Sequence, residues 1–365
     1  MRVPRVASLL AALACCSLLP GLLSGQSVHG RVLDANSRRA IVGALVELRD
    51  LTGKPLRIVL TSGSGNFEIT TPAAGRYFYR IAAIGYAPRP PAPITVPADG
   101  LNLGDLTLSA TVMRLPDLLA IGHGKFCGKS KVPDETFDRI LESANTSLEI
   151  IAATIDSRRV GFDVLEIHER SLYSAMGAIV IADSMTLPLA RWPVQSIDPD
   201  SLRAFGFGRE VRPGDPGSRE YYGPDPRVLF ADWFLASHCF SLDKVKAGAE
   251  TLHVRFAPAA KSKLIDIGGE LLLDAHNLAL LQFSFTHRNL PSWMPDQASG
   301  GDMEFQQLAS GLWIAASWSI WAPVERLPGP NNPAEVAGRT ETRGHVIKVY
   351  LGGVDSTGVK TDSAH

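Results

Sequence analysis

The chain has 365 residues, of which 45% are hydrophobic and 20% are charged. This composition is typical of a globular protein with two domains of ordinary size, and it excludes a disordered chain. The formal net charge of −1 argues against broad electrostatic attraction to nucleic acid or anionic lipid. No apolar run after the first 25 residues is long enough to predict a membrane-spanning helix.

Residues 1–25 are predicted to be a signal peptide. A basic start is followed by an apolar run and two small residues, in the order Arg2, Arg5, 6–23, Ser24 and Gly25. Cleavage is expected just before Gln26, which sends the mature protein to the periplasm or the outer membrane. Two alternatives stay open: a lipoprotein acylated at Cys15 or Cys16, and an N-terminal membrane anchor interrupted at Pro20.

Seven short alternating runs occupy residues 28–110, and each is bounded by residues that form turns. The stretch GNFEITTPAAGRYFYRIAAIGY, residues 65–86, is typical of a β-hairpin, because apolar residues alternate on both sides of a break at 72–75. Seven strands in so short a segment predict an antiparallel Greek-key β-sandwich.

Turn glycines and inward apolar residues follow one another at regular spacing in this segment. They are Gly30, Val32, Asp34, Ile41, Val42, Gly43, Ala44, Val46, Leu48, Thr61, Gly65, Asn66, Phe67, Gly75, Tyr77, Gly85 and Tyr86. Residues 27–110 thereby resemble the carboxypeptidase regulatory-like domain, a transthyretin-like sandwich. The resemblance implies a module that accompanies a zinc peptidase without cutting peptides, or an N-terminal adaptor of bacterial outer-membrane proteins.

Related sandwiches are classed as carbohydrate-binding-like. Tyr77, Tyr79 and Tyr86 are therefore candidates to stack on a sugar. The alternative is that they are core residues or cross-strand pairs, as aromatic residues at alternate strand positions usually are.

Residues 111–132 are polar and rich in turn residues, and we interpret them as a linker. A helix is expected from Pro133 to about Ala153, since apolar residues recur there at helical spacing. A second helix is expected from Asp225 to Ser237, with Pro226 in its first turn.

The remaining runs between 161 and 352 alternate as strands do, and Asp274 to Asn277 form the expected turn of a hairpin. Residues 133–352 are thus predicted to be an α+β domain, with a large antiparallel sheet and one or two helices; the resemblance given next implies a half-barrel-like sheet. A flexible tail follows at 353–365. The whole chain is predicted to be mainly β.

Strand, glycine and Asp-turn order in this second half resembles the LolA-like half-barrels, which wrap a curved sheet around a helix or a lipid tail. The residues concerned are Ile267, Gly268, Gly269, Glu270, Leu271, Leu273, Asp274, Gly300, Gly301, Glu304, Phe305, Gly311 and Trp313. The whole chain, with the segment YYGPDPRVLFADWFLASHCF, also resembles uncharacterised exported bacterial proteins that carry a carboxypeptidase regulatory-like domain.

The sequence contains no HExxH, GxSxG, P-loop or GxGxxG pattern in a fitting context. No catalytic, cofactor-binding or metal-ligating residue is therefore predicted, and no cofactor is expected. His168 stands near Glu166 and Glu169, but strand alternation is expected to turn it away from both acids.

Two further clusters contain residue types that could carry out chemistry. His238 beside Cys239 suggests a thiol nucleophile activated by the imidazole. Adjacent side chains at a helix end seldom point at each other, which argues against this interpretation. Asp198, Asp200 and Asp215 invite a calcium site, but their segments are typical of ordinary turns.

Four tryptophans crowd into 29 residues: Trp293, Trp313, Trp318 and Trp321. Trp313 and Trp318 are expected on opposite faces of the sheet, one in the core and one at a groove or partner surface. The alternative is that the tryptophans are core and scattered surface aromatics.

Removal of the leader leaves Cys127 and Cys239. An exported protein meets an oxidising compartment, so this pair is predicted to form a disulfide that pins the linker to the second domain. The alternative is two separate buried thiols.

These observations predict a non-enzymatic binding or adaptor protein of the bacterial envelope. Its partner is an unidentified envelope protein, lipid or glycan. The rivals are a periplasmic carrier of lipid or lipoprotein acyl chains, a carbohydrate-binding protein and a hydrolase of unrecognised type.

Overall fold

The computed structural model describes residues 26–87, 89–111, 125–127, 135–157, 160–174, 176–189, 191–211, 219–246, 248–326 and 333–351. The predicted signal peptide, Cys15, Cys16, Asp215 and the predicted tail lie outside these residues. Within the described part of the chain, no helix is long and apolar enough to cross a membrane.

The first seven strands form two sheets packed face to face, as predicted. They are β1 (Ser27–Asp34), β2 (Leu45–Arg49), β3 (Pro55–Leu60), β4 (Asn66–Thr70), β5 (Gly75–Ala82), β6 (Ala92–Val96) and β7 (Leu101–Leu108). One sheet has the order β4-β1-β7 and the other β3-β2-β5-β6. Contrary to an all-antiparallel prediction, β1 pairs with β7 in parallel.

The hairpin predicted at 65–86 is wrong, because β4 and β5 belong to different sheets. β4 pairs with β1, whereas β5 pairs with β2 and β6. Alternation gives each strand one apolar face, and these faces meet across the sandwich rather than side by side: Phe67, Ile69 and Ile81 are all buried in one core cluster. The chain passes from one sheet to the other just after β4, where the single O–H of Thr71 is shared between the carbonyls of Gln26 and Ala73, at 3.1 and 3.0 Å.

The second half consists of helices and one ten-stranded antiparallel sheet. Its strands are β8 (Lys125–Cys127), β9 (Val160–Ser174), β10 (Gly177–Pro188), β13 (His238–Leu242), β14 (Thr251–Pro258), β15 (Asp266–Asp274), β16 (Leu280–Arg288), β17 (Gly300–Gln307), β18 (Trp313–Arg326) and β19 (Glu335–Leu351). The order is β10-β9-β19-β18-β17-β16-β15-β14-β13-β8. A separate pair, β11 (Gly208–Glu210) and β12 (Arg219–Tyr221), lies beside it.

Helix α2 (Glu135–Asp156) confirms the helix predicted from Pro133 and runs three residues further than expected. The predicted second helix is broken in two: α4 (Pro226–Leu229) and α5 (Asp232–Ser237). The break falls at Ala231, whose backbone is extended. A short helix α3 (Pro199–Phe205) begins where turns were expected, and strand β8 lies inside the predicted linker.

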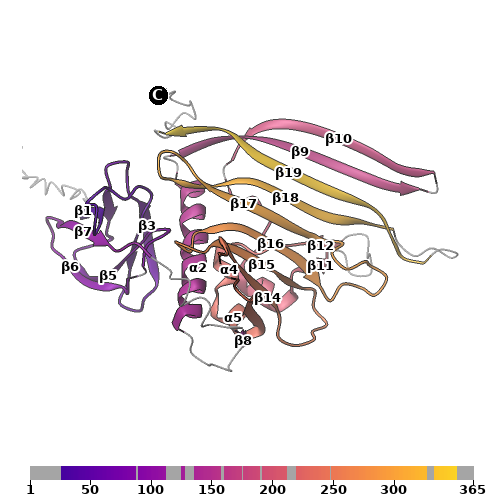
Figure 1. Ribbon diagram of the computed structural model, residues 1–365, viewed down its shortest axis with the longest axis horizontal. Coiled ribbons are helices and arrows are strands. Elements are labelled where there is room, and N and C mark those ends of the chain that lie inside the picture. Colours follow the sequence, from indigo (N-terminus) through magenta and orange to yellow (C-terminus); the bar gives the residue numbers. More distant parts are fainter. Residues whose placement is uncertain are drawn as a thin grey trace, which may run out of the picture.

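Helix α2 lies between the sandwich and the large sheet (Figure 1). One side of it, including Phe137, Ile140 and Leu148, is buried in the core of the sheet domain. Ile150, on another side, is buried against Leu45 and Leu60 of the sandwich. The fold class is thus confirmed as mainly β, and α2 contributes to the cores of both halves.

Trp313 and Trp318 do not lie on opposite faces of the sheet, so that prediction is wrong. The register of β18 against β17 shifts between Glu304 and Phe305, which inserts an extra residue into β18 between the two tryptophans. Because a bulge reverses the alternation that follows it, both side chains face the same core cluster. The Trp318 ring lies over Gly344 of β19, where an added Cβ would come within 2.2 Å of the indole.

Candidate functional site

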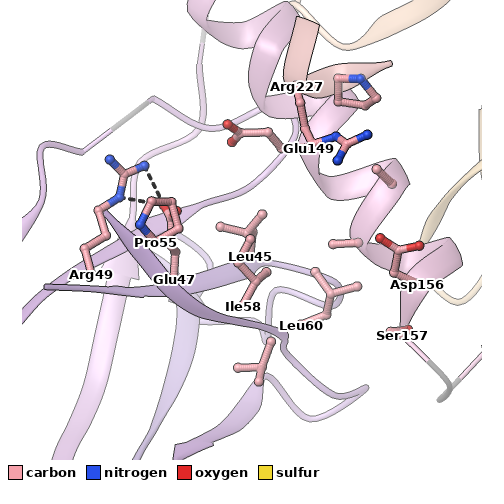
Figure 2. A pocket seen from close by; sticks show the side chains of 14 residues that line it. Leu45, Glu47, Arg49, Pro55, Ile58, Leu60, Glu149, Asp156, Ser157 and Arg227 are labelled. Carbon is pink, nitrogen blue, oxygen red and sulfur yellow. Dashed lines mark hydrogen bonds and ion pairs between the residues drawn. The ribbon is translucent and has the colours of Figure 1, made fainter. Parts of the chain in front are cut away.

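A groove opens where the sandwich meets α2, and we name it the junction groove (Figure 2). Its volume is about 440 Å³, within the usual range for ligand pockets. The lining residues come from β2, β3, α2, α4 and the segments beside them: Leu45, Glu47, Arg49, Pro55, Ile58, Val59, Leu60, Glu149, Ala152, Ala153, Asp156, Ser157, Pro226 and Arg227.

The floor of the junction groove is largely apolar, and it is formed by β2 and β3. Strand β2 is covered on both faces, by the sandwich on one side and by α2 on the other. Val46 and Leu48 point into the sandwich, whereas Leu45 and Glu47 point toward α2, and all four are buried. On the neighbouring edge strand β3, Ile58 remains 48% exposed within the groove. The floor therefore offers an apolar side chain next to a strand edge.

One end of the groove is closed by a charged network that joins the two halves. The guanidinium of Arg80 on β5 lies 2.8 Å from Glu149 of α2 and 3.4 Å from Glu47 of β2. Arg49 adds a second contact to Glu47 at 2.7 Å. Arg80 also donates to the hydroxyl of Thr146 at 3.3 Å. Because Glu47 and Arg80 are buried, this network fixes how α2 lies on the sandwich.

The other end of the groove carries a carboxylate. Figure 2 shows the apolar side chains in the middle, with the Glu47–Arg49 pair at one end and Asp156 toward the other. Partial burial raises the pKa of Asp156, and the positive charge of Arg227 partly offsets this. Arg227 itself is held by Asp225, which caps the start of α4. The groove thus combines an apolar floor with a negative end.

His168 is closer to an acid than the sequence analysis expected. Residues two apart on a strand share a face, so alternation brings Glu166 to His168 and sends only Glu169 away. The His168 Nε2 to Glu166 Oε2 distance is 3.3 Å. On the same face, Thr342 of β19 contacts His168 Nδ1 at 3.2 Å. Among the described residues, no group of three or more His, Cys, Asp or Glu is arranged to hold a metal ion.

His238 lies beside Ser237 and Asp266, and these two neighbours line a second pocket. Its Nδ1 is 3.0 Å from the Ser237 hydroxyl and its Nε2 is 3.1 Å from Asp266. Both ring nitrogens also face backbone carbonyls, of Phe234 at 3.1 Å and Ile267 at 3.2 Å. The ring is fully buried and stacks on Phe234. Through these contacts the imidazole joins α5 to β15.

The aspartates considered for calcium have local roles. Asp198 accepts a hydrogen bond from the Ser201 backbone at 3.0 Å and caps α3. Asp200 lies in the first turn of the same helix, where a carboxylate stabilises the helix end.

The candidate aromatic residues are spread over four places. Tyr77, Tyr79 and Tyr86 pack against the sandwich core. Trp318 is buried in the sheet core and Trp313 packs against it, while Tyr86 and Trp313 meet at a small crevice of about 150 Å³. Trp293 lies in the β16–β17 loop. Trp321, on the outer face, lines another pocket and has the Arg339 guanidinium 4.9 Å from its ring.

Cys239 on β13 stands directly opposite Cys127 on β8 in the register of the sheet. Opposed residues in an antiparallel pair have Cα atoms about 4.5–5.5 Å apart. That spacing falls within the range of about 4.4–6.8 Å that a disulfide spans. The predicted bond is therefore compatible with the backbone.

The junction groove was not predicted from the sequence. The usable signal was the segment ALVELRD at 44–50, where apolar residues occupy adjacent positions as well as alternate ones. Such a strand is buried on both faces, which predicts a second layer outside the sandwich. No short-range pattern in the sequence indicates that α2 forms this second layer.

Comparison with known proteins gives one family match and several distant structural likenesses. A cohesin–X-dockerin complex of Acetivibrio cellulolyticus is 22% identical, over 34% of this chain and 90% of that chain, with a TM-score of 0.21. A DUF3823 family protein from Bacteroides uniformis is 11% identical, over 66% and 92% of the two chains, also at 0.21. At such TM-scores these likenesses carry no argument about function.

No curated protein matches this chain. The likeness of residues 133–352 to LolA-like half-barrels stays a prediction. The carboxypeptidase regulatory-like domain model matches residues 27–109, the segment that folds as the seven-stranded sandwich. Residues 27–109 of this chain are therefore a carboxypeptidase regulatory-like domain.

Proposed function

We propose that this protein is a non-enzymatic binding or adaptor protein, and that its junction groove takes an extended segment of a partner protein. The observation that carries the proposal is the pairing of an apolar groove with the edge strand β3 of a regulatory-like sandwich. Edge strands bind extended peptides by adding a strand to the sheet.

The groove would contribute three kinds of contact. The backbone of β3 supplies hydrogen bonds to an added strand, and Ile58 with the alanines of α2 supplies an apolar pocket for one side chain. Asp156 supplies a negative charge at one end. A partner segment with an apolar anchor and a basic residue fits these contacts best.

We further propose that the protein acts in the bacterial envelope. Support comes from the leader-like pattern of residues 1–25 and from the cysteine pair, which suits an oxidising compartment. The leader is tested by N-terminal sequencing of the mature protein, where an intact Met1 would contradict it.

Site-specific photo-cross-linking tests the groove. A benzoylphenylalanine at position 58 is expected to label a discrete envelope protein, whereas the same probe at position 57, on the other side of β3, is expected not to. Ala153→Arg, which fills the groove, should abolish the label at position 58. Because Ala153 also packs against the cluster of Leu45, Leu60 and Ile150, circular dichroism is used to check that the variant is folded. A peptide of the labelled sequence should then bind the purified protein and not the Ala153→Arg variant.

Three results would contradict the proposal. Equal labelling at positions 57 and 58 would remove the groove as the binding site. Labelling that survives Ala153→Arg would do the same. Adducts consisting only of lipid would favour the carrier of acyl chains instead.

A further inference from the structure

Strand β10 is the open edge of the ten-stranded sheet, at the end far from β8. Its sequence is GAIVIADSMTLP, and every residue except Leu187 is exposed. The exposed fractions of Ile179, Val180 and Ile181 are 59%, 56% and 62%. Such a strand presents unpaired backbone groups and apolar side chains together.

The usual protections of an edge strand are missing along most of β10. Its register with β9 runs without a bulge from Gly177 opposite Ser174 to Pro188 opposite Asp163. Asp183 is its one charged residue, and Pro188 stands at its last position. Monomeric proteins protect long edges with charges, prolines or bulges, so an edge of this kind calls for a partner strand.

The first half of the strand contains a palindrome, Ala178-Ile179-Val180-Ile181-Ala182. When a strand pairs antiparallel with a second copy of itself about a two-fold axis, each residue meets the residue reflected through the axis. With the axis at Val180, every member of a palindrome meets its own kind. A segment of another protein has no such reason to match both halves of this run.

We propose that two copies of this chain pair antiparallel through β10, with Val180 on the two-fold axis. Val180 then lies opposite the partner's Val180, and Ile179 opposite the partner's Ile181. Branched apolar pairs of this kind stabilise antiparallel strands. Asp183 meets the partner's Gly177, so no like charges oppose each other. The two ten-stranded sheets become one continuous sheet across the axis.

Engineered cross-linking tests both the dimer and its register. In Val180→Cys the two thiols face each other across the axis, and oxidation is expected to give a covalent dimer through residue 180. The matched control is Ser184→Cys, which is exposed on the same face of the same strand. In the proposed register its two copies are about 27 Å apart, so no cross-link is expected.

The oligomeric state of the full chain provides a second measurement. Light scattering should give a dimer for the parent protein and a monomer for Val180→Lys, which places two like charges on the axis, while Ser184→Lys should remain a dimer. A monomeric parent protein would overturn the proposal. A cross-link at position 184 instead of 180, or open-ended assemblies, would also overturn it.

Discussion

The two edges of the ten-stranded sheet are built in opposite ways. At one edge, β8 has three residues, and its neighbour β13 has buried residues at every second position. At the other edge, β10 has 12 residues and almost all are exposed. The described part of the first edge strand is short, whereas the second edge strand is long and its exposed residues are available for pairing.

The difference shows that burial depends on what covers a strand, because both regions contain strands rich in large apolar residues. Phe283 and Phe285 on β16 lie under α2 and the short helices and are buried. Ile179 and Ile181 on β10 occupy equivalent alternate positions and are exposed. In the covered region such residues build the core, and at the β10 edge they form a surface suited to association.

The largest expected effect concerns the edge formed by β8. A Cys127–Cys239 disulfide would close a loop of about 112 residues, and the Cys127→Ser/Cys239→Ser variant is then expected to lose about 4–5 kcal/mol of unfolding free energy. Denaturant unfolding without reductant measures this loss. Reduced parent protein serves as the control and should match the variant. Peptide mapping that finds both thiols free in unreduced protein would contradict the bond.

Two substitutions by alanine compare how much side chains in the covered and uncovered parts of the sheet contribute to the unfolding free energy. Phe283→Ala removes a fully buried ring that stacks between Phe256 and Phe285, so a loss of about 3–5 kcal/mol is expected. Ile181→Ala on β10 should change the stability of the monomer by less than about 0.5 kcal/mol. Equal losses, measured by denaturant unfolding of monomeric protein, would show that the β10 side chains are buried in solution.

A substitution in the charged network tests whether the sandwich and the sheet domain unfold together. Arg80→Met leaves Glu47 and Glu149 without their shared partner, and about 3 kcal/mol should be lost, since breaking a buried ion pair is costly. Arg76→Met, an exposed position on the same face of β5, is the control. Calorimetry should resolve two transitions in Arg80→Met and one in the control. A single unshifted transition in Arg80→Met would show that the network does not couple the halves.

The smallest expected effect is a pH dependence of the unfolding free energy, which comes from the buried residue His287 on β16. Burial lowers the pKa of His287 from its ordinary value of 6.5, while its hydrogen bond to the Tyr222 carbonyl and the charge of Asp266 oppose this. The unfolded chain therefore binds more protons than the folded one below that value. Stability contributed by neutral His287 is fully present above pH 6.5 and is lost as the pH falls toward the lower folded pKa.

His287→Gln removes this titration, so its melting temperature should fall less steeply from pH 7 to pH 5 than that of the parent protein. His276→Gln, at an exposed turn of the covered sheet, should retain the parent slope. Identical slopes for the parent and His287→Gln would assign the acid sensitivity to other groups.

Much of the architecture could be read from short-range patterns. Alternation and turn residues located the seven strands of the sandwich, and helical spacing located α2. The turn at Asp274 was also predictable, because its carboxylate accepts hydrogen bonds from the backbone of His276 and Asn277. Each of these signals acts within a few residues and needs no distant partner.

The errors share one cause, which is contact between segments far apart in the chain. The β4–β5 hairpin failed because β1 and β2 compete for these strands, and the Trp313–Trp318 prediction failed because a bulge depends on the neighbouring strand β17. The junction groove needs β2, β3, α2 and α4 together.

The amino-acid sequence by itself determined that the chain is mainly β, where the regulatory-like domain lies, and that 178–182 is palindromic. Only the tertiary structure decided that this run occupies an open edge, because edge and interior strands have the same local geometry and differ only in their neighbours. The same holds for Ile150 of α2, whose burial against Leu45 and Leu60 follows from the packing of two halves that no local pattern connects.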